Sequence, residues 1–77
     1  MHELDLVVLT EPVATHGLEA GDIGTIVHAY HDSAAYEVEF VTAEGATVAV
    51  LTLTPTDIRA MASREILHAR EISAAVS

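Results

Sequence analysis

"GTIVHAYHDSAAYEVEFVTAEGATVAVLTLT", residues 24–54, decides the fold of this chain. Three runs in this stretch alternate β-branched or aromatic residues with polar ones, at 24–31, 35–42 and 46–54. Each run is typical of a β-strand. The short segments between the runs contain Asp32 and Gly45, which favour tight turns. The stretch therefore predicts two successive β-hairpins.

Segments on either side of this stretch extend the same pattern. "LDLVVLT", residues 4–10, predicts one strand before it. "TPTD" predicts a single helical turn over residues 55–57 with Thr54 as its cap, and "IRAM", residues 58–61, is a possible fifth strand. Four or five short antiparallel strands at regular spacing predict a mainly β chain that closes into a small barrel.

The alternation also predicts which side chains are buried. The expected core consists of Val7, Val27, Val38, Phe40, Leu51 and Leu53. The strands are apolar on both faces, however, so a second set of apolar side chains is left over. Ile26, beside His28 and Tyr30, belongs to this second set, as do Val48 and Val50. An exposed apolar patch usually marks an interface or is covered by another element.

The tail, residues 62–77, is the predicted cover for this second face. "SREILHAREISAAV", residues 63–76, predicts an amphipathic helix capped by Ser63. Its apolar stripe would consist of Ile66, Ala69, Ile72 and Val76. An isolated helix of about fifteen residues is marginal in water. We therefore expect the tail to pack on the barrel domain, residues 1–61, or on another chain.

The charge of the chain is strongly one-sided. Its formal net charge is −9, it has no lysine, and its three arginines, Arg59, Arg64 and Arg70, all follow residue 58. Proteins that bind nucleic acid or anionic membranes need clustered cations, so we expect neither kind of partner. Solubility alone is sufficient to explain the acidity, because net charge rarely encodes a partner; the sharper hypothesis is an acidic face that matches a basic protein.

The same composition bears on the compartment. The sequence shows no signal-peptide pattern, no apolar run of membrane-spanning length and no cysteine. The plain expectation is a cytoplasmic protein.

"GLEAGDIG", residues 17–24, invites comparison with a phosphate-binding loop. Such a loop follows a strand, precedes a helix and usually includes a lysine, whereas here a strand follows the glycines and lysine is absent. We interpret Gly17 and Gly21 as positions of positive φ, and Gly24 as a site of close backbone approach.

No residues form a recognisable catalytic, cofactor or metal site. His28 and His31 are three residues apart on a predicted strand, so they point to opposite faces and do not share a metal easily. Glu37 and Glu39 lie on one strand face, about 7 Å apart. A carboxylate pair can perform acid–base chemistry, but a small barrel fills its interior with side chains and leaves no substrate pocket. We expect a protein that is not an enzyme and has no cofactor.

Residues 3 to about 60, "ELDLVVLT…GLEAGDIGTIVHAYHDSAAYEVEFVTAEGATVAVLTLTPTDIR", resemble a small bacterial family, domain of unknown function four-nine-two-six. The resemblance implies an SH3-like barrel with no established activity. Members of the family look like the small partners found beside proteins of toxin or nitrile-hydratase type. The tail departs from the usual family pattern, so the resemblance implies nothing about its role.

The favoured hypothesis is a non-catalytic, acidic protein-interaction module, similar to an immunity protein, an antitoxin or an accessory subunit. Its partner would be another protein, and the charge favours a basic one. The alternative is a structural homo-oligomer, and a small-ligand binder or an enzyme is less favoured. The candidate partner-binding residues are Ile26, His28, Tyr30, Glu37, Glu39, Val48, Val50, Ile66 and Ile72.

Overall fold

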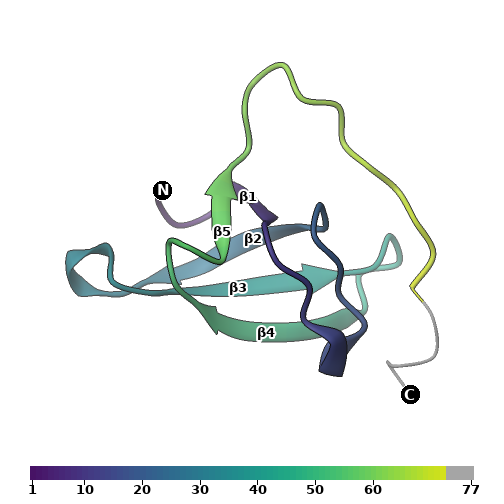
Figure 1. Cartoon of the computed structure of the whole chain (residues 1–77), viewed down its shortest axis with the longest axis horizontal. Helices are drawn as coiled ribbons and strands as arrows, with labels where there is room; N and C mark the ends of the chain where they lie inside the picture. Colours follow the sequence, from purple (N-terminus) through teal and green to yellow (C-terminus); the bar gives the residue numbers. More distant parts are fainter. Residues whose placement is uncertain (73–77) are drawn as a thin grey trace.

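The computed structural model describes residues 1–72, which form five antiparallel strands in one open sheet (Figure 1). The strands are β1 (Leu6–Leu9), β2 (Ile23–Ala29), β3 (Tyr36–Val41), β4 (Thr47–Leu53) and β5 (Ile58–Ala60). Their order in the sheet is β4-β3-β2-β1-β5, so β1 to β4 pair in succession and β5 returns to pair with β1. The prediction of a mainly β chain with four or five antiparallel strands is confirmed.

The turns between the strands follow the predicted chemistry in two places and differ in a third. Asp32, in the 3-10 turn η2 (His31–Ser33), and Gly45 have positive φ of 64° and 86°. Before β5, the chain makes a hydrogen-bonded turn in place of the helical turn predicted over 55–57. The Asp57 carboxylate accepts hydrogen bonds of 2.9 Å from both the amide and the hydroxyl of Thr54. Ile58, the next residue, already belongs to β5, so the turn does not continue into a helix.

Two glycines in the loop before β2 and at its start behave as interpreted. Gly17 ends the 3-10 turn η1 (Ala14–His16) with φ of 70°, in the left-handed region that favours glycine. At Gly24, an added Cβ would lie 2.6 Å from Cγ1 of Val38 and 2.9 Å from Cε1 of Phe40. Glycine is therefore required at this position for β2 to lie against the core side chains of β3.

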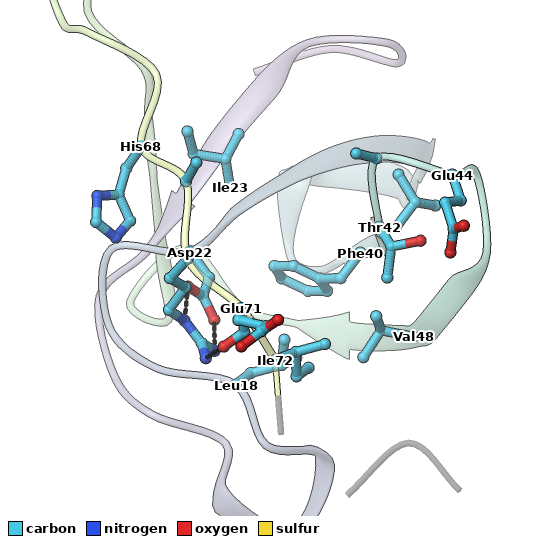
Figure 2. A pocket seen from close by; sticks show the side chains of 14 residues that line it. Leu18, Asp22, Ile23, Phe40, Thr42, Glu44, Val48, His68, Glu71 and Ile72 are labelled. Carbon is cyan, nitrogen blue, oxygen red and sulfur yellow. Dashed lines mark hydrogen bonds and ion pairs between the residues drawn. The ribbon is translucent and has the colours of Figure 1, made fainter. Parts of the chain in front are cut away.

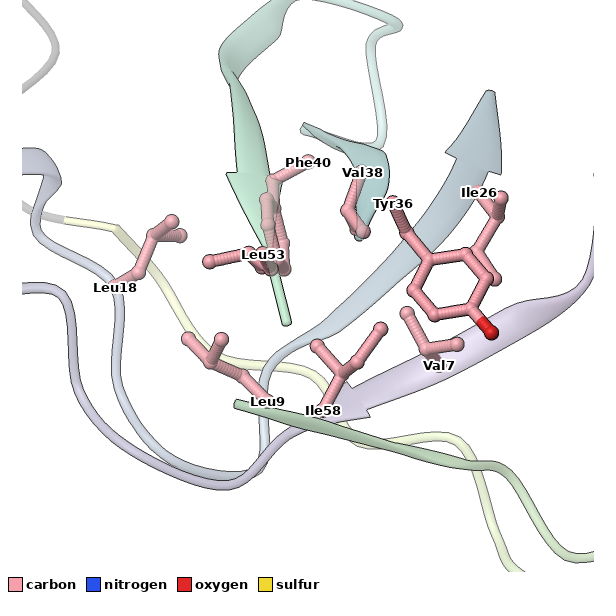
Figure 3. Close-up of a cluster of buried hydrophobic side chains, with 9 residues drawn as sticks. All are labelled: Val7, Leu9, Leu18, Ile26, Tyr36, Val38, Phe40, Leu53 and Ile58. Atoms are coloured by element: carbon pink, nitrogen blue, oxygen red, sulfur yellow. The ribbon is translucent and has the colours of Figure 1, made fainter. Parts of the chain in front are cut away.

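The core is a single cluster to which all five strands and the β1–β2 loop contribute (Figure 3). Its buried members are Val7, Leu9, Leu18, Ile26, Tyr36, Val38, Phe40, Leu53 and Ile58. Burial of Val7, Val38, Phe40 and Leu53 is confirmed, and Leu51 packs half-buried against the cluster.

The prediction that Val27 belongs to the core is wrong. Val27 is 40% exposed, whereas Ile26 is 0% exposed and occupies the core instead. The cause is a β-bulge, because the register of β2 against β3 shifts between Ile26 and His28 and leaves Val27 without a paired residue. Strict alternation placed Ile26 on the exposed face, where it could bind a partner. Because it is buried, Ile26 cannot be a partner-binding residue.

The helix predicted over residues 63–76 is wrong for the part that the structure describes. Residues 62–72 contain only a turn at 63–64 and otherwise run as a long irregular segment away from β5 (Figure 1). Residues 73–76 of the predicted helix lie outside the described residues. Ile66, which was assigned to the buried stripe, is 92% exposed. In place of the helix, residues 62–72 form two ion pairs with the rest of the chain, which are described below.

Candidate functional site

Two arginine–carboxylate pairs hold the described part of the tail, one near each end. Arg59 of β5 donates from Nη1 and Nη2 to the two carboxylate oxygens of Glu65, at 2.7 and 2.6 Å. Arg70 of the tail donates from Nε and Nη2 to the two carboxylate oxygens of Asp22, at 2.8 and 2.5 Å. Bidentate pairs of this kind are stronger and more specific in geometry than single hydrogen bonds. Two of the three arginines of the chain thus bind within the chain.

Glu65 fixes the turn at which the tail leaves β5. Its carboxylate also accepts a hydrogen bond of 2.6 Å from the amide of Ala62. The Arg59 guanidinium and this amide lower the pKa of Glu65 to about 2. Glu65 is therefore ionised at neutral pH and keeps Arg59 occupied.

Asp22, just before β2, accepts three hydrogen bonds, as Glu65 does, and its side chain is more buried than that of Glu65. Only 13% of its side chain is exposed, and its Oδ2 also accepts the amide of Glu19 at 2.8 Å. Arg70 makes one further bond, from Nη2 to the carbonyl of Gly17, at 2.8 Å. Burial would raise the pKa of Asp22, but the bonds from Arg70 and the Glu19 amide outweigh burial and lower it. Asp22 is thus an ionised anchor for a guanidinium and a poor proton acceptor.

A groove of about 570 Å³ lies between the tail and the β3–β4 turn (Figure 2). Ile72 enters it from the tail and Val48 from β4, and both pack against the core cluster. Leu18 and Phe40, which belong to that cluster, form part of the groove wall. The residues that line the groove are Leu18, Asp22, Ile23, Phe40, Val41, Thr42, Ala43, Glu44, Val48, His68, Ala69, Arg70, Glu71 and Ile72. The groove therefore joins an apolar floor to an ion-paired end.

A second candidate surface is the side of β2, β3 and β4 that faces away from the core. We call it the outer face; its residues are His28, Tyr30, Glu37, Glu39, Thr47, Val50 and Thr52. Glu37 and Glu39 alternate along β3 with the buried Tyr36, Val38 and Phe40. Across the sheet, Glu37 pairs with Thr52 and Glu39 with Val50. The outer face therefore presents two carboxylates of one strand side by side.

Hydroxyl groups hold these carboxylates in place. Oε2 of Glu37 accepts bonds from Thr52 Oγ1 at 2.5 Å and from Tyr30 Oη at 2.7 Å. The Thr52 and Tyr30 hydroxyls lower the pKa of Glu37, which stays ionised. Oε2 of Glu39 accepts a bond of 2.9 Å from Thr47 Oγ1. The His28 ring packs edge-on against Tyr30, with ring centroids 4.7 Å apart.

The nine residues predicted to bind a partner separate into four groups. Five of them come together on the outer face: His28, Tyr30, Glu37, Glu39 and Val50. Val48 and Ile72 meet in the groove. Ile26 is buried in the core, and the exposed Ile66 belongs to neither surface.

Sequence reasoning missed Asp22 and Arg70 as a pair. Residues 17–24, which include Asp22, were interpreted as a turn, and residues 63–76, which include Arg70, as a helix. The signal that could have found them is the shortage of cations. The chain has twelve acidic residues and only three arginines, so each arginine is expected to pair with some carboxylate in the folded chain. Nothing in the spacing, however, indicates that position 70 meets position 22.

Residues 1–72 also bear on metal binding and on membrane insertion. No three His, Asp or Glu side chains there are arranged to hold a metal ion. No helix in the same part of the chain has the length and the apolar character needed to span a bilayer.

A family model matches residues 3–60, which contain all five strands, Asp22 and the whole outer face. The chain belongs to this family, Domain of unknown function (DUF4926). The resemblance recognised in the sequence is confirmed. No curated protein and no solved structure shows a significant match to the chain. The outer face belongs entirely to the DUF4926 domain, whereas the groove is shared between that domain and the tail beyond residue 60.

Proposed function

We propose that this chain is a non-catalytic protein-interaction module that binds a basic partner protein through the outer face. The observation that carries the proposal is the arrangement of Glu37 and Glu39. Among the described residues, hydroxyl groups bond only their Oε2 atoms, so the Oε1 atoms remain for cations of a partner. The two carboxylates are positioned before a ligand arrives, which reduces the cost of ordering them on binding.

The surroundings of the carboxylates support a basic protein as the partner. Glu37 and Glu39 are about 7 Å apart along the strand, the spacing of alternate side chains on an extended partner segment. Tyr30 is 43% exposed and Val50 50% exposed, so apolar surface lies beside the charges. An aromatic ring beside a carboxylate favours a cation, because both attract positive charge. The net charge of −9 would speed association with such a partner.

The proposal includes an SH3-like barrel and a cytoplasmic protein of the immunity, antitoxin or accessory-subunit kind. The SH3-like arrangement is supported by four strands that pair in succession and a fifth that returns to the first. The cytoplasmic setting is supported by the lack of cysteine, since many small secreted domains rely on disulfides. A non-catalytic role is supported by the lowered pKa values of Asp22 and Glu37, which make both carboxyls poor proton carriers at neutral pH.

Affinity capture from cells of the source organism with matched variants tests the proposal. Glu37→Gln with Glu39→Gln removes both charges but keeps one accepting oxygen at each position, and Glu11→Gln with Asp32→Asn removes the same charge outside both the outer face and the groove. We expect the wild type and the control variant to retain one and the same protein. The Glu37→Gln, Glu39→Gln variant should retain at least tenfold less of it, and high salt should release it. Equal retention by both variants, or no retained protein, would contradict the proposal.

A homo-oligomer is the second candidate, and the edge strand β4 favours it. Within the described residues β4 pairs on one side only, with β3, and Thr47–Leu53 contains no charged residue. Native sheets usually protect such an edge with charges or proline. Two copies can pair β4 with β4 across a two-fold axis. Light scattering at millimolar concentration would then show a dimer that Val50→Lys disrupts; a monomer would exclude this candidate.

A further inference from the structure

We propose that the surface that Arg70–Ile72 cover at one wall of the groove is a binding site for an extended peptide segment of a partner protein, with an arginine followed two residues later by a branched aliphatic residue. Arg70–Ile72 of the tail is the intramolecular occupant of this site. The site is separate from the outer face, so the inference does not depend on the function proposed above.

The first half of the site recognises a guanidinium. Asp22 accepts two bonds from Arg70, and the Gly17 carbonyl accepts a third. Glu19 adds a carboxylate oxygen 3.7 Å from Nη1 of the same arginine. A planar group with donors on two sides fits this set of oxygens, whereas the single ammonium of lysine fits only part of it. The site therefore selects arginine.

The second half recognises an aliphatic side chain. Ile72 packs against the core cluster at the groove, where Leu18, Phe40 and Val48 line the wall (Figure 2). Side chains two residues apart in an extended segment point to the same side, so an arginine and an aliphatic residue at this spacing reach both halves together. The spacing of Arg70 and Ile72 thus defines the ligand.

The tail resembles a bound ligand more than a part of the domain. The groups that receive it, from Gly17 to Val48, lie within the family match at residues 3–60, and the tail lies outside it. Between its two anchors the tail exposes apolar side chains, with Ile66 92% and Leu67 63% exposed. The far end of the described tail is therefore held by the contacts of Arg70 and Ile72. Because the contacts made by residues 66–72 are few, a partner segment that makes the same ones can replace them.

Charge complementarity identifies the class of partner. Glu19 and Glu44 lie near this surface in addition to Asp22. A partner segment with further cations near its arginine gains attraction that the tail, which carries Glu71, does not have. The occupant in trans is accordingly a basic segment of another protein.

The experiment uses the full chain and a labelled peptide, ILHAREI, which copies residues 66–72 and has Arg70 as its only arginine. Fluorescence anisotropy measures its binding to the wild type and to the variant Arg70→Ala with Ile72→Ala, in which the tail has lost both side chains that hold it on this surface. We expect the variant to bind at least tenfold more tightly, because the tail competes in the wild type as a tethered ligand. Asp22→Asn added to the variant should abolish binding.

Two controls distinguish specific binding of the peptide from nonspecific binding. The variant Arg64→Ala with Ile66→Ala changes the same residue types in the tail but neither anchor, and it should bind as weakly as the wild type. A peptide with Gln in place of the arginine and Asp in place of the last isoleucine should not bind. Equal affinity for the wild type and the Arg70→Ala, Ile72→Ala variant, no binding to that variant, or equal binding of both peptides would overturn the proposal.

Folding and self-association are checked in parallel. If circular dichroism shows that the double variant is unfolded, Arg70→Ala alone, which keeps Ile72, is judged by the same criteria. Light scattering shows whether the chain associates with itself. If the wild type were a dimer and Arg70→Ala a monomer, the site would bind the tail of a second copy, and the assignment to another protein would be overturned.

Discussion

The sheet and the tail both carry regular apolar patterns, but only the sheet uses its pattern to build a core. In the sheet, side chains from five strands gather in one buried cluster. In the tail, two ion pairs and the half-buried Ile72 provide the attachment, and Ile66 is left in solvent. Apolar periodicity therefore determines structure only where another layer is present to bury it. The tail is instead placed by where its charged residues find partners.

The largest expected effect is in the sheet, at Phe40. Phe40 is 2% exposed, and truncation of a buried phenylalanine to alanine costs about 3–5 kcal/mol. Urea denaturation should show this loss for Phe40→Ala. The neighbouring Val41 is 51% exposed, and Val41→Ala should change the stability little. Equal stability of the wild type and Phe40→Ala would mean that the core of the sheet is assigned to the wrong face.

A smaller loss of stability is expected at Gly24, where β2 lies close to β3. Gly24→Ala places a Cβ 2.6 Å from Val38 Cγ1 and 3.1 Å from the Glu39 carbonyl oxygen, which belongs to the backbone and cannot move aside easily. Overpacking of this kind costs about 1–3 kcal/mol. Thermal denaturation followed by circular dichroism measures it. An alanine variant as stable as the wild type would show that β2 and β3 are further apart than described.

In the tail the effects should be smaller still, and two isoleucines allow a matched test. Ile72 is half-buried against the core cluster, so Ile72→Ala should cost about 1 kcal/mol, below the range for a fully buried aliphatic side chain. Ile66 is 92% exposed, and Ile66→Ala should stay within about 0.5 kcal/mol of the wild type. Urea denaturation of both variants measures these two losses of stability. A larger loss for Ile66→Ala than for Ile72→Ala would support the helical stripe predicted from the sequence.

The smallest effect concerns pH. The folded-state pKa of Glu65 is about 2, below its ordinary value of 4.5. Because the pKa is lowered on folding, the Arg59–Glu65 pair stabilises the chain fully above pH 4.5, and the contribution is lost as the pH falls toward 2. The difference in melting temperature between the wild type and Glu65→Gln should therefore shrink over this range. It should also shrink in high salt, because the pair is exposed. A difference that is constant with pH would mean that the pair does not form in solution.

Much of the sheet could be predicted from the sequence, because its strands are half-buried and their alternation is local information. The assignments of Val38, Phe40 and Leu53 to the core follow from alternation alone. Val27 was misplaced because a bulge inserts one residue into β2, and an insertion depends on the fit between two strands, which no single strand encodes. Ile58 and Leu18 were missed because a short strand and a loop show too few residues to establish a period.

The candidate sites were less predictable, for a related reason. Glu37 and Glu39 were found because they are neighbours on one strand. Asp22 and Arg70 are 48 positions apart, and their meeting depends on the path of the whole tail. A sequence shows that an arginine needs a carboxylate, but it does not show which one the fold brings within reach.

The central claim is that the Arg70–Asp22 pair attaches the tail to a sheet that does not depend on it. Backbone ¹⁵N relaxation of the full chain tests this claim most directly, in the wild type, in Arg70→Ala and in the control Arg64→Ala. The account predicts order parameters for residues 68–72 near the value of about 0.85 typical of rigid backbone in the wild type and in Arg64→Ala. In Arg70→Ala they should fall below about 0.6, with β1 to β5 unchanged. A tail that stays rigid in Arg70→Ala, or strands that loosen together with it, would contradict the account.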